Sequence, residues 1–250
     1  DLGMLYYMPQ IWTSDNTDAL SRYYIQYGTY YGYKQSVVGA HVSDTPSAQV
    51  LRKTPLETRF NISSFGLLGY ELDITQLTKF ETAVIRKQID FYKKHRNLLQ
   101  FGELYRLKNP FETNEMQLIV VSKDKKEAIL GLFQILQKPT VEFDKIPLPM
   151  LDAKKTYKIE KREQYFSLDT FGHLVKHALP IKLNAKGILF HLLKNRYLFK
   201  SEKDFQIVKG DVLVNHGFIP KQKYIGTGYN DTIRLMGDFG SRLYYLKEVE

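Results

Sequence analysis

The chain contains no cysteine among its 250 residues. Disulfides, thiolate metal ligands and a thiol nucleophile are therefore excluded within it, and a cysteine-free composition fits a reducing compartment, which predicts a cytoplasmic protein. No apolar run approaches the roughly 20 residues needed to cross a bilayer, and no signal peptide is visible. We therefore expect no membrane partner. The chain also lacks an initiator Met, so we expect it to be part of a longer polypeptide.

Patterns that would hold a cofactor are also missing. Among six histidines only His173 and His177 are spaced four apart, and they lack the intervening Glu and the third ligand of a zinc helix. The glycines of the turn Gly237–Gly240 do not follow a strand and open a helix, as a phosphate-binding loop does. The sequence therefore predicts neither a metal site nor a nucleotide cofactor.

The net charge of +9 raises the question of nucleic-acid binding. Most of the excess positive charge lies in residues 151–250, where basic side chains are spaced singly along the chain rather than clustered. Such spacing is typical of a solvated face. We therefore expect no nucleic-acid partner.

Residues 1–97 alternate between strand and helix patterns, which implies a parallel sheet with helices packed on it. The expected strands and helices are, in order, Met4–Met8, Ala19–Tyr27, Val37–Val42, Leu56–Phe65, Leu67–Leu72 and Thr75–Arg96. Gly28 is placed to stop the first helix. Three such βα units cannot close a barrel alone. If they belong to one, the remaining strands lie upstream.

Residues 98–250 show a different pattern of short alternating runs separated by polar turns, which favours an antiparallel, sandwich-like domain. The expected strands are Glu103–Leu107, Gln117–Ser122, Ala128–Leu136, Lys155–Arg162, Asp211–Asn215 and Arg242–Leu246. Residues Lys186–Phe199 fit either a helix or two strands. We therefore divide the chain into an α/β domain, residues 1–97, and an all-β domain, residues 98–250.

The segment Trp12–Asp18 concentrates chemically useful side chains at a strand-to-helix junction. It holds the only tryptophan and two acids, Asp15 and Asp18. Asp15 is either a catalytic acid at the end of a barrel strand or a helix cap, and spacing alone favours the cap. Asp18 is expected to be structural. Trp12 is either a platform for a sugar ring or a core residue that needs a partner for its indole N–H.

A histidine and an acid follow the second expected strand in the run Gly39–Asp44. His41 would line the same mouth as Asp15, although a structural histidine at a strand end is the commoner case. A catalytic triad of Ser43, His41 and Asp44 is improbable, because three neighbours in one extended segment point to alternate faces and no nucleophile elbow is present.

The run Trp12–Ala19 resembles a motif of glycoside hydrolase family 36, the bacterial and fungal α-galactosidases, and residues 173–231 have a weak likeness to its lactic-acid-bacterial members. Further blocks match in the same order along the chain, namely Asp1–Gln10, Ile25–Thr29, Gly39–Ser43, Thr58–Asn61, Gly69–Asp73 and Gly237–Leu246. The resemblance implies a retaining α-galactosidase acting on α-galactoside oligosaccharides such as melibiose and raffinose. By the match, Asp15 stands where the family carries its general acid/base, at the end of the sixth barrel strand.

The resemblance also fixes expectations for the rest of the molecule. The chain would form the last three βα units of a (β/α)8 TIM barrel, followed by a C-terminal antiparallel β-sandwich. The family's nucleophile lies in a Lys-Trp-Asp motif, and its galactose pocket is lined by a Cys-Ser-Gly-Gly-Gly stretch. Neither occurs here, so the isolated chain should be inactive. Family members often form tetramers, so we expect a homo-oligomer.

Two other functions stay open at this point. The chain could serve only as a structural and oligomerisation module. This alternative is favoured for the isolated chain, because the second catalytic carboxylate of the family is absent from it. It could also belong to a relative that transfers galactose to an acceptor sugar instead of hydrolysing it.

Overall fold

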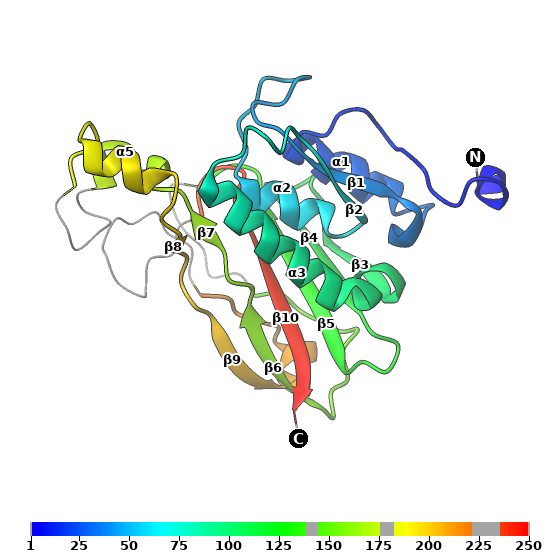
Figure 1. Ribbon diagram of the computed structural model, residues 1–250. Coiled ribbons are helices and arrows are strands. Elements are labelled where there is room, and N and C mark those ends of the chain that lie inside the picture. The colour runs from blue at the N-terminus through cyan, green and yellow to red at the C-terminus, as the bar shows by residue number, and fades with distance from the viewer. Residues whose placement is uncertain (1, 139–144, 176–182, 222–235, 250) are drawn as a thin grey trace.

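The computed structural model of the protein describes residues 2–138, 145–175, 183–221 and 236–249 (Figure 1). Two parallel strands, β1 (Gly39–Ser43) and β2 (Leu67–Glu71), form a small sheet in the N-terminal part. Ile11 extends the same parallel pairing through one bridge to Val38. Three neighbouring parallel positions thus follow one another in chain order, as the predicted βα units require.

Helices connect these strands and cover one face of the sheet. Helix α1 (Ala19–Thr29) begins at the cap residue Asp18 and runs through Gly28, so this glycine does not end it. Helix α2 (Leu56–Ser63) begins after Pro55. Helix α3 (Lys79–Phe101) starts with a capping box between Thr78 and Glu81, which satisfies two backbone N–H groups.

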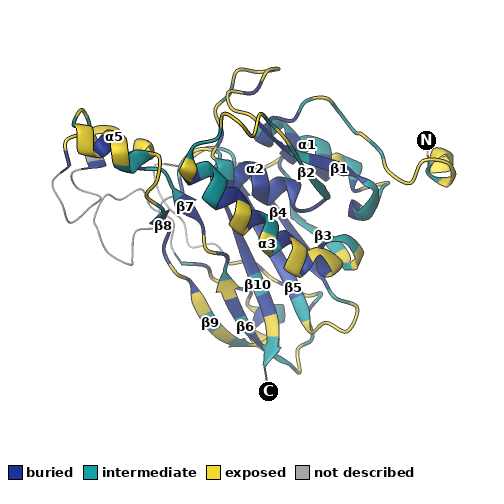
Figure 2. Ribbon diagram, in the orientation of Figure 1, coloured by how far each residue is buried: buried dark blue, intermediate teal, exposed yellow. Residues whose placement is uncertain are grey.

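The predicted strand Met4–Met8 is wrong. Residues Leu2–Tyr6 form the short 3₁₀ helix η1, which contains no buried residue and lies away from the rest of the fold (Figures 1 and 2). A strand needs a neighbour to accept and donate its backbone hydrogen bonds. In the described part of the chain this segment has no adjacent strand, so its apolar side chains alone cannot hold it extended.

The remaining long strands form one antiparallel sheet in the order β3-β4-β5-β10-β6-β9. Their bounds are Glu103–Lys108, Glu115–Val121, Glu127–Gln134, Ser241–Val249, Thr156–Lys161 and Phe205–Lys209. The predicted antiparallel β region is confirmed. Within the described residues it consists of this single large sheet, beside a small pair of strands, β7 (Tyr165–Phe166) and β8 (Phe199–Lys200).

Three helical segments interrupt the β region among its described residues. The 3₁₀ helix η3 spans Leu168–Leu174, and α5 spans Ile188–Lys194, so the ambiguous stretch contains a helix. Helix α6 occupies Gly210–Asn215, where a strand was predicted; that prediction is wrong. The strand lies one segment earlier, in β9. Leu213 of α6 is buried against the sheet, between the exposed Val212 and the half-buried Val214, a pattern that a short helix and a short strand share.

The core is continuous across the two parts of the chain. Figure 1 shows α2 and α3 lying over the large sheet. Residue 97 lies inside α3, and one apolar cluster combines the helices with β4, β5 and β10. Its members include Tyr23, Phe60, Phe65, Leu99, Met116, Phe133 and Leu243. The large sheet is thus covered on one face by the helices of the N-terminal part. The division into domains 1–97 and 98–250 stays a prediction.

Candidate functional site

The segment 12–18, hereafter the acid loop, lies at the carboxyl end of β1. Ser43, the last residue of β1, donates from Oγ to the backbone oxygen of Thr17 at 3.2 Å. The indole Nε1 of Trp12 donates to Oδ1 of Asp15 at 2.9 Å, and both residues are exposed. Asp15 therefore does not cap α1, and Trp12 is not a core residue. The polar end of the indole instead fixes the orientation of an accessible carboxylate.

His41 lies beside this pair, on the same face of the parallel sheet. Its ring centroid is 4.4 Å from that of Trp12, with the planes tilted by 53°. The Nδ1 atom lies 3.3 Å from Oε2 of Glu71 at the end of β2. The structure thus brings together the three residues singled out from sequence and adds Glu71, whose side chain is 59% exposed.

Two glycines provide the space for these rings. A Cβ at Gly69, the residue paired with His41, would lie 2.5 Å from the His41 ring. A Cβ at Gly39 would lie 3.1 Å from the Trp12 ring. Because side chains alternate along a strand, Ala40 and Val42 point into the helix-covered core, where they are fully buried. The opposite face of the sheet therefore carries the rings and the carboxylates.

Asp18 and Arg22 attach the acid loop to helix α1. Asp18 is the cap of α1 and accepts hydrogen bonds from N and Oγ of Ser21 at 2.9 and 3.0 Å, which confirms its structural role. Arg22 donates to Oγ1 of Thr13 at 2.7 Å and to the backbone oxygen of Ser14 at 2.8 Å. Burial lowers the pKa of the Arg22 guanidinium, but arginine keeps its charge at neutral pH.

The loop between β1 and α2, residues 44–55 and hereafter the β1–α2 loop, also contacts the acid loop. Gln49 donates from Nε2 to the backbone oxygen of Asp15 at 2.8 Å. Arg52 forms an ion pair with Asp18 through Nη1 and Oδ2. Sequence reasoning missed Gln49, Arg52 and Glu71 as site residues. Only the matching block Gly69–Asp73 drew attention to this part of the chain, and it gave no role to the glutamate.

The triad judged improbable is not formed. Ser43 Oγ binds the Thr17 backbone, His41 faces Glu71, and the Asp44 carboxylate accepts a hydrogen bond from the backbone N–H of Asp73 at 3.4 Å. These three neighbours therefore have separate partners.

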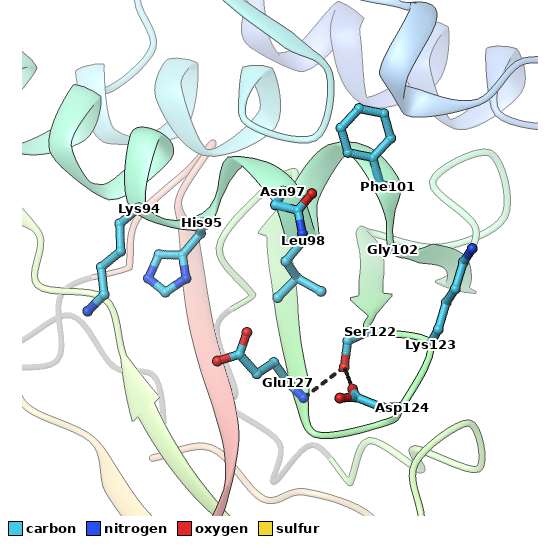
Figure 3. Close-up of a pocket in the computed structure, with 10 residues that line it drawn as sticks. All are labelled: Lys94, His95, Asn97, Leu98, Phe101, Gly102, Ser122, Lys123, Asp124 and Glu127. Carbon is cyan, nitrogen blue, oxygen red and sulfur yellow. Dashed lines mark hydrogen bonds between the residues drawn. The ribbon is translucent and has the colours of Figure 1, made fainter.

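A separate hollow of about 500 Å³ lies between the end of α3 and the turn joining β4 to β5 (Figure 3). Its serine, Ser122, donates to Asp124 at 2.7 Å and accepts from the backbone N–H of Glu127 at 3.0 Å, as the turn requires. His95 packs against the rings of Phe91 and Tyr245. Ser122 and His95 thus have other partners, and the hollow presents no nucleophile paired with a base.

No group of three metal-ligating side chains comes together within the described residues. Of the His173–His177 pair, His177 lies outside them. No described helix combines the length and apolar character of a membrane span.

Comparison with known proteins assigns the chain to a family. A profile described as the glycosyl hydrolase family 36 C-terminal domain matches residues 115–246. The chain belongs to glycoside hydrolase family 36. The Melibiase profile matches residues 1–102, so the two profiles together cover both the region of parallel strands and the antiparallel sheet.

Curated family 36 relatives are substantially longer. Alpha-galactosidase AgaA of Geobacillus stearothermophilus is 49% identical over 160 residues, which are 64% of this chain and 22% of that protein. Alpha-galactosidase Mel36A of Lactobacillus acidophilus is 41% identical over 174 residues, 70% of this chain and 24% of that protein. The chain spans about a quarter of the length of these relatives.

The fold agrees with solved family 36 structures. A crystal structure of a variant of Geobacillus stearothermophilus AgaA in complex with raffinose matches the whole chain with a TM-score of 0.73 and 36% identity, over 27% of its own length. The α-galactosidase of Lactobacillus brevis matches with a TM-score of 0.73, 34% identity, and 28% of its length covered.

Proposed function

We propose that this chain supplies the general acid/base, Asp15, of a retaining α-galactosidase that removes terminal α-galactosyl groups from melibiose- and raffinose-type oligosaccharides. The observation that carries the proposal is the exposed Asp15 carboxylate, held by the Trp12 indole at the carboxyl end of a parallel strand. Barrel enzymes place their catalytic groups at that end of the sheet. Several family 36 relatives bear the name alpha-galactosidase.

The proposal includes the architecture of the intact enzyme. The Ile11 bridge, β1 and β2, with α1 to α3, are the last three βα units of a (β/α)8 barrel, and residues 98–250 form the C-terminal β-sandwich domain. Two features support this: the strands are parallel and consecutive, and the described helices α1 and α2 pack on the face opposite His41. In a barrel, the His41 face would be the interior.

Each site residue has a defined role in the proposed reaction. A retaining glycosidase needs two carboxyl groups about 5–5.5 Å apart, one to attack the anomeric carbon and one to protonate the leaving oxygen. Asp15 gives its proton to that oxygen and later accepts one from water. The indole binds Oδ1, so in this proposal Oδ2 is the oxygen that carries the transferred proton. The nucleophile comes from outside this chain.

Trp12 and His41 contribute the sugar-binding surface in this proposal. Their rings pack against each other with 41% of Trp12 exposed, which offers an apolar face beside a carboxylate. A tryptophan suits a sugar because its ring is apolar while its N–H reaches a polar partner. The Glu71 carboxylate holds His41 in place from the neighbouring strand.

Replacement of the acid tests the proposed function. In a protein that carries this chain behind the preceding barrel segment, Asp15→Asn should lower kcat on raffinose by about 10²- to 10⁴-fold, because the amide cannot transfer the proton. Hydrolysis of an aryl α-galactoside with a good leaving group should fall much less in its first step.

Asp124→Asn is the matched control, since Asp124 lies in the exposed turn between β4 and β5. This variant should hydrolyse raffinose and the aryl α-galactoside at the rates of the unaltered protein. Unaltered raffinose hydrolysis by Asp15→Asn would remove Asp15 from the mechanism. Hydrolysis of an aryl α-galactoside by the isolated 250-residue chain would contradict an external nucleophile. The expected homo-oligomer stays a prediction, which sedimentation equilibrium would measure.

A further inference from the structure

A buried carboxylate at the base of the acid loop is neutralised from the β1–α2 loop. The side chain of Asp18 has no exposed surface, and its Oδ2 pairs with Nη1 of Arg52. Removing one partner of a buried ion pair is strongly destabilising, because the other charge remains without water or counter-charge. The backbone N–H of Asp18 also binds Oδ1 of Asn16 at 3.1 Å. The end of the acid loop is therefore fixed where Arg52 holds Asp18.

The β1–α2 loop is bent so that Arg52 faces the acid loop. Ser47 accepts a backbone hydrogen bond from Leu51 at 2.8 Å, and its own N–H donates to the backbone oxygen of Arg52 at 2.9 Å. Leu51 adopts a left-handed conformation with φ of 55°, which is unfavourable for a bulky side chain. Gln49 of the same turn holds the Asp15 backbone. One bent loop thus contacts the acid loop at both acids.

The antiparallel region also contacts Arg52. Phe239 belongs to the turn 237–240, just before β10, and its ring lies under the Arg52 guanidinium, 5.5 Å from centroid to Cζ. Phe239 also has a left-handed backbone, with φ of 58°. Its N–H donates to the backbone oxygen of Ile135 at 2.9 Å, and Gln134 Nε2 donates to the backbone oxygen of Gly237 at 3.1 Å. The end of β5 therefore holds the ring in place.

We propose that Phe239 is a positioning residue for the catalytic acid: by holding Arg52 against Asp18, it fixes the loop that carries Trp12 and Asp15. The proposal rests on the proposed role of Asp15. A strained backbone at a bulky residue is retained where the surroundings over-determine it, and here the strained position puts an aromatic ring of one region beneath an arginine of the other. The antiparallel region thereby takes part in the geometry of the site.

The chain offers a direct measure of this positioning, because Trp12 is its only tryptophan. In the 250-residue chain, Phe239→Leu removes the ring and keeps an apolar side chain. Losing a cation–π contact of about 0.5–1.4 kcal/mol corresponds to a roughly two- to tenfold shift in the population of the ordered loop. We expect Trp12 fluorescence to shift to longer wavelength and its quenching by acrylamide to increase. Phe239→Tyr, which keeps the ring, should match the unaltered chain.

The control removes a different aromatic ring from a different arginine. Tyr31 lies 3.4 Å from Cζ of Arg106, beyond the end of α1 opposite to the acid loop. Tyr31→Leu should leave Trp12 emission and quenching unchanged. Arg52→Gln removes the contacts of Arg52 with Phe239 and Asp18 without altering the turn 237–240. It should increase Trp12 quenching at least as much as Phe239→Leu. Unchanged quenching in both Phe239→Leu and Arg52→Gln would overturn the proposal.

Kinetics separate this inference from the proposed function. With the preceding barrel segment present, Phe239→Leu should lower kcat on raffinose by about two- to tenfold, with a smaller effect on KM and on aryl α-galactosides. If the unaltered protein hydrolyses no α-galactoside, the proposed function fails while the fluorescence result still tests the contact. If it hydrolyses raffinose and Phe239→Leu does so at the same kcat, the positioning role fails and the proposed function stands.

Discussion

The two regions of the molecule use their strands differently. Strands β4 and β5 are buried along nearly their whole length, because one face of the large sheet packs on the helices and the other on the chain around residues 146–151 and α6. In β2 every residue except the exposed Glu71 is half-buried. The centre of the large sheet, β4 and β5, is covered on both faces, whereas β2 has one face open.

This difference locates the chemistry. At the centre of the large sheet, the side chains on both faces pack in hydrophobic clusters. On the open face of the parallel strands, side chains that packing does not require stand together: Trp12, His41 and Glu71, with Asp15 at the edge. Helices α2 and α3 pack in one core with both the parallel strands and the large sheet. The two regions are therefore held together by the same side chains.

The largest expected effect tests whether the two regions unfold as one. Glu57 on α2 accepts hydrogen bonds from the backbone N–H of Tyr165 at 2.8 Å and from Gln88 at 3.1 Å, and it forms a buried ion pair with Arg162 after β6. Glu57→Gln should lower the free energy of unfolding in urea by about 3–5 kcal/mol, because the Arg162 charge is left buried without its partner. The transition should remain single.

A double variant and a surface pair serve as controls. Adding Arg162→Met to Glu57→Gln should restore most of the lost stability, since no unpaired charge remains. Glu160→Gln breaks the exposed pair with Lys158 and should cost less than about 1 kcal/mol. Two separate urea transitions in the Glu57 variant would instead show that the regions unfold independently.

A smaller effect on stability is expected at the candidate site, on the open face of the parallel strands. Gly69→Ala places a Cβ 2.5 Å from the His41 ring, so the ring must move, at a cost of about 1–3 kcal/mol, and Trp12 fluorescence should change with it. Gly28→Ala is the matched control in α1, where a Cβ meets nothing within 4 Å. It should stabilise the chain by about 0.5–1 kcal/mol without altering Trp12 emission. Unchanged emission in Gly69→Ala would contradict the packing of the two rings.

The smallest expected effect is a pH dependence at the contact between α3 and the large sheet. Burial, together with the nearby charge of Lys94, lowers the pKa of His95 to about 4. Glu127, which faces the ring from β5, opposes this shift. An unfolded histidine takes up a proton below about pH 6.5. The neutral His95 ring therefore contributes to the stability of the folded state above that pH, and this contribution is lost as the pH falls toward 4.

Urea midpoints measured between pH 7 and pH 5 should fall for the unaltered chain and fall less for His95→Gln. His191→Gln, at an exposed position of α5, should keep the slope of the unaltered chain. Equal slopes in all three proteins would show that His95 does not contribute to the pH dependence. The effect is small because His95 borders the open hollow of Figure 3, where water screens its charge.

Periodic patterns predicted most elements because they reflect local physics. Helix α3 combines an apolar stripe with a capping box, and strands β3, β4 and β10 follow alternating runs close to their observed bounds. The failures were segments whose conformation depends on neighbours. The apolar run Met4–Met8 has no strand beside it among the described residues, and Asp211–Asn215 is too short for its periodicity to separate a helix from a strand.

By itself, the sequence determined the family, the change from alternating to antiparallel patterns, and the candidate residues Trp12, Asp15 and His41, because motifs and periodicity are local properties of the chain. Only the tertiary structure decided that Asp18 rather than Asp15 caps α1, that Glu71 faces His41, and that Phe239 lies against Arg52. The last two contacts join residues far apart in sequence, and the cap depends on the conformation of the acid loop; strand register and loop conformation are not encoded in any local pattern.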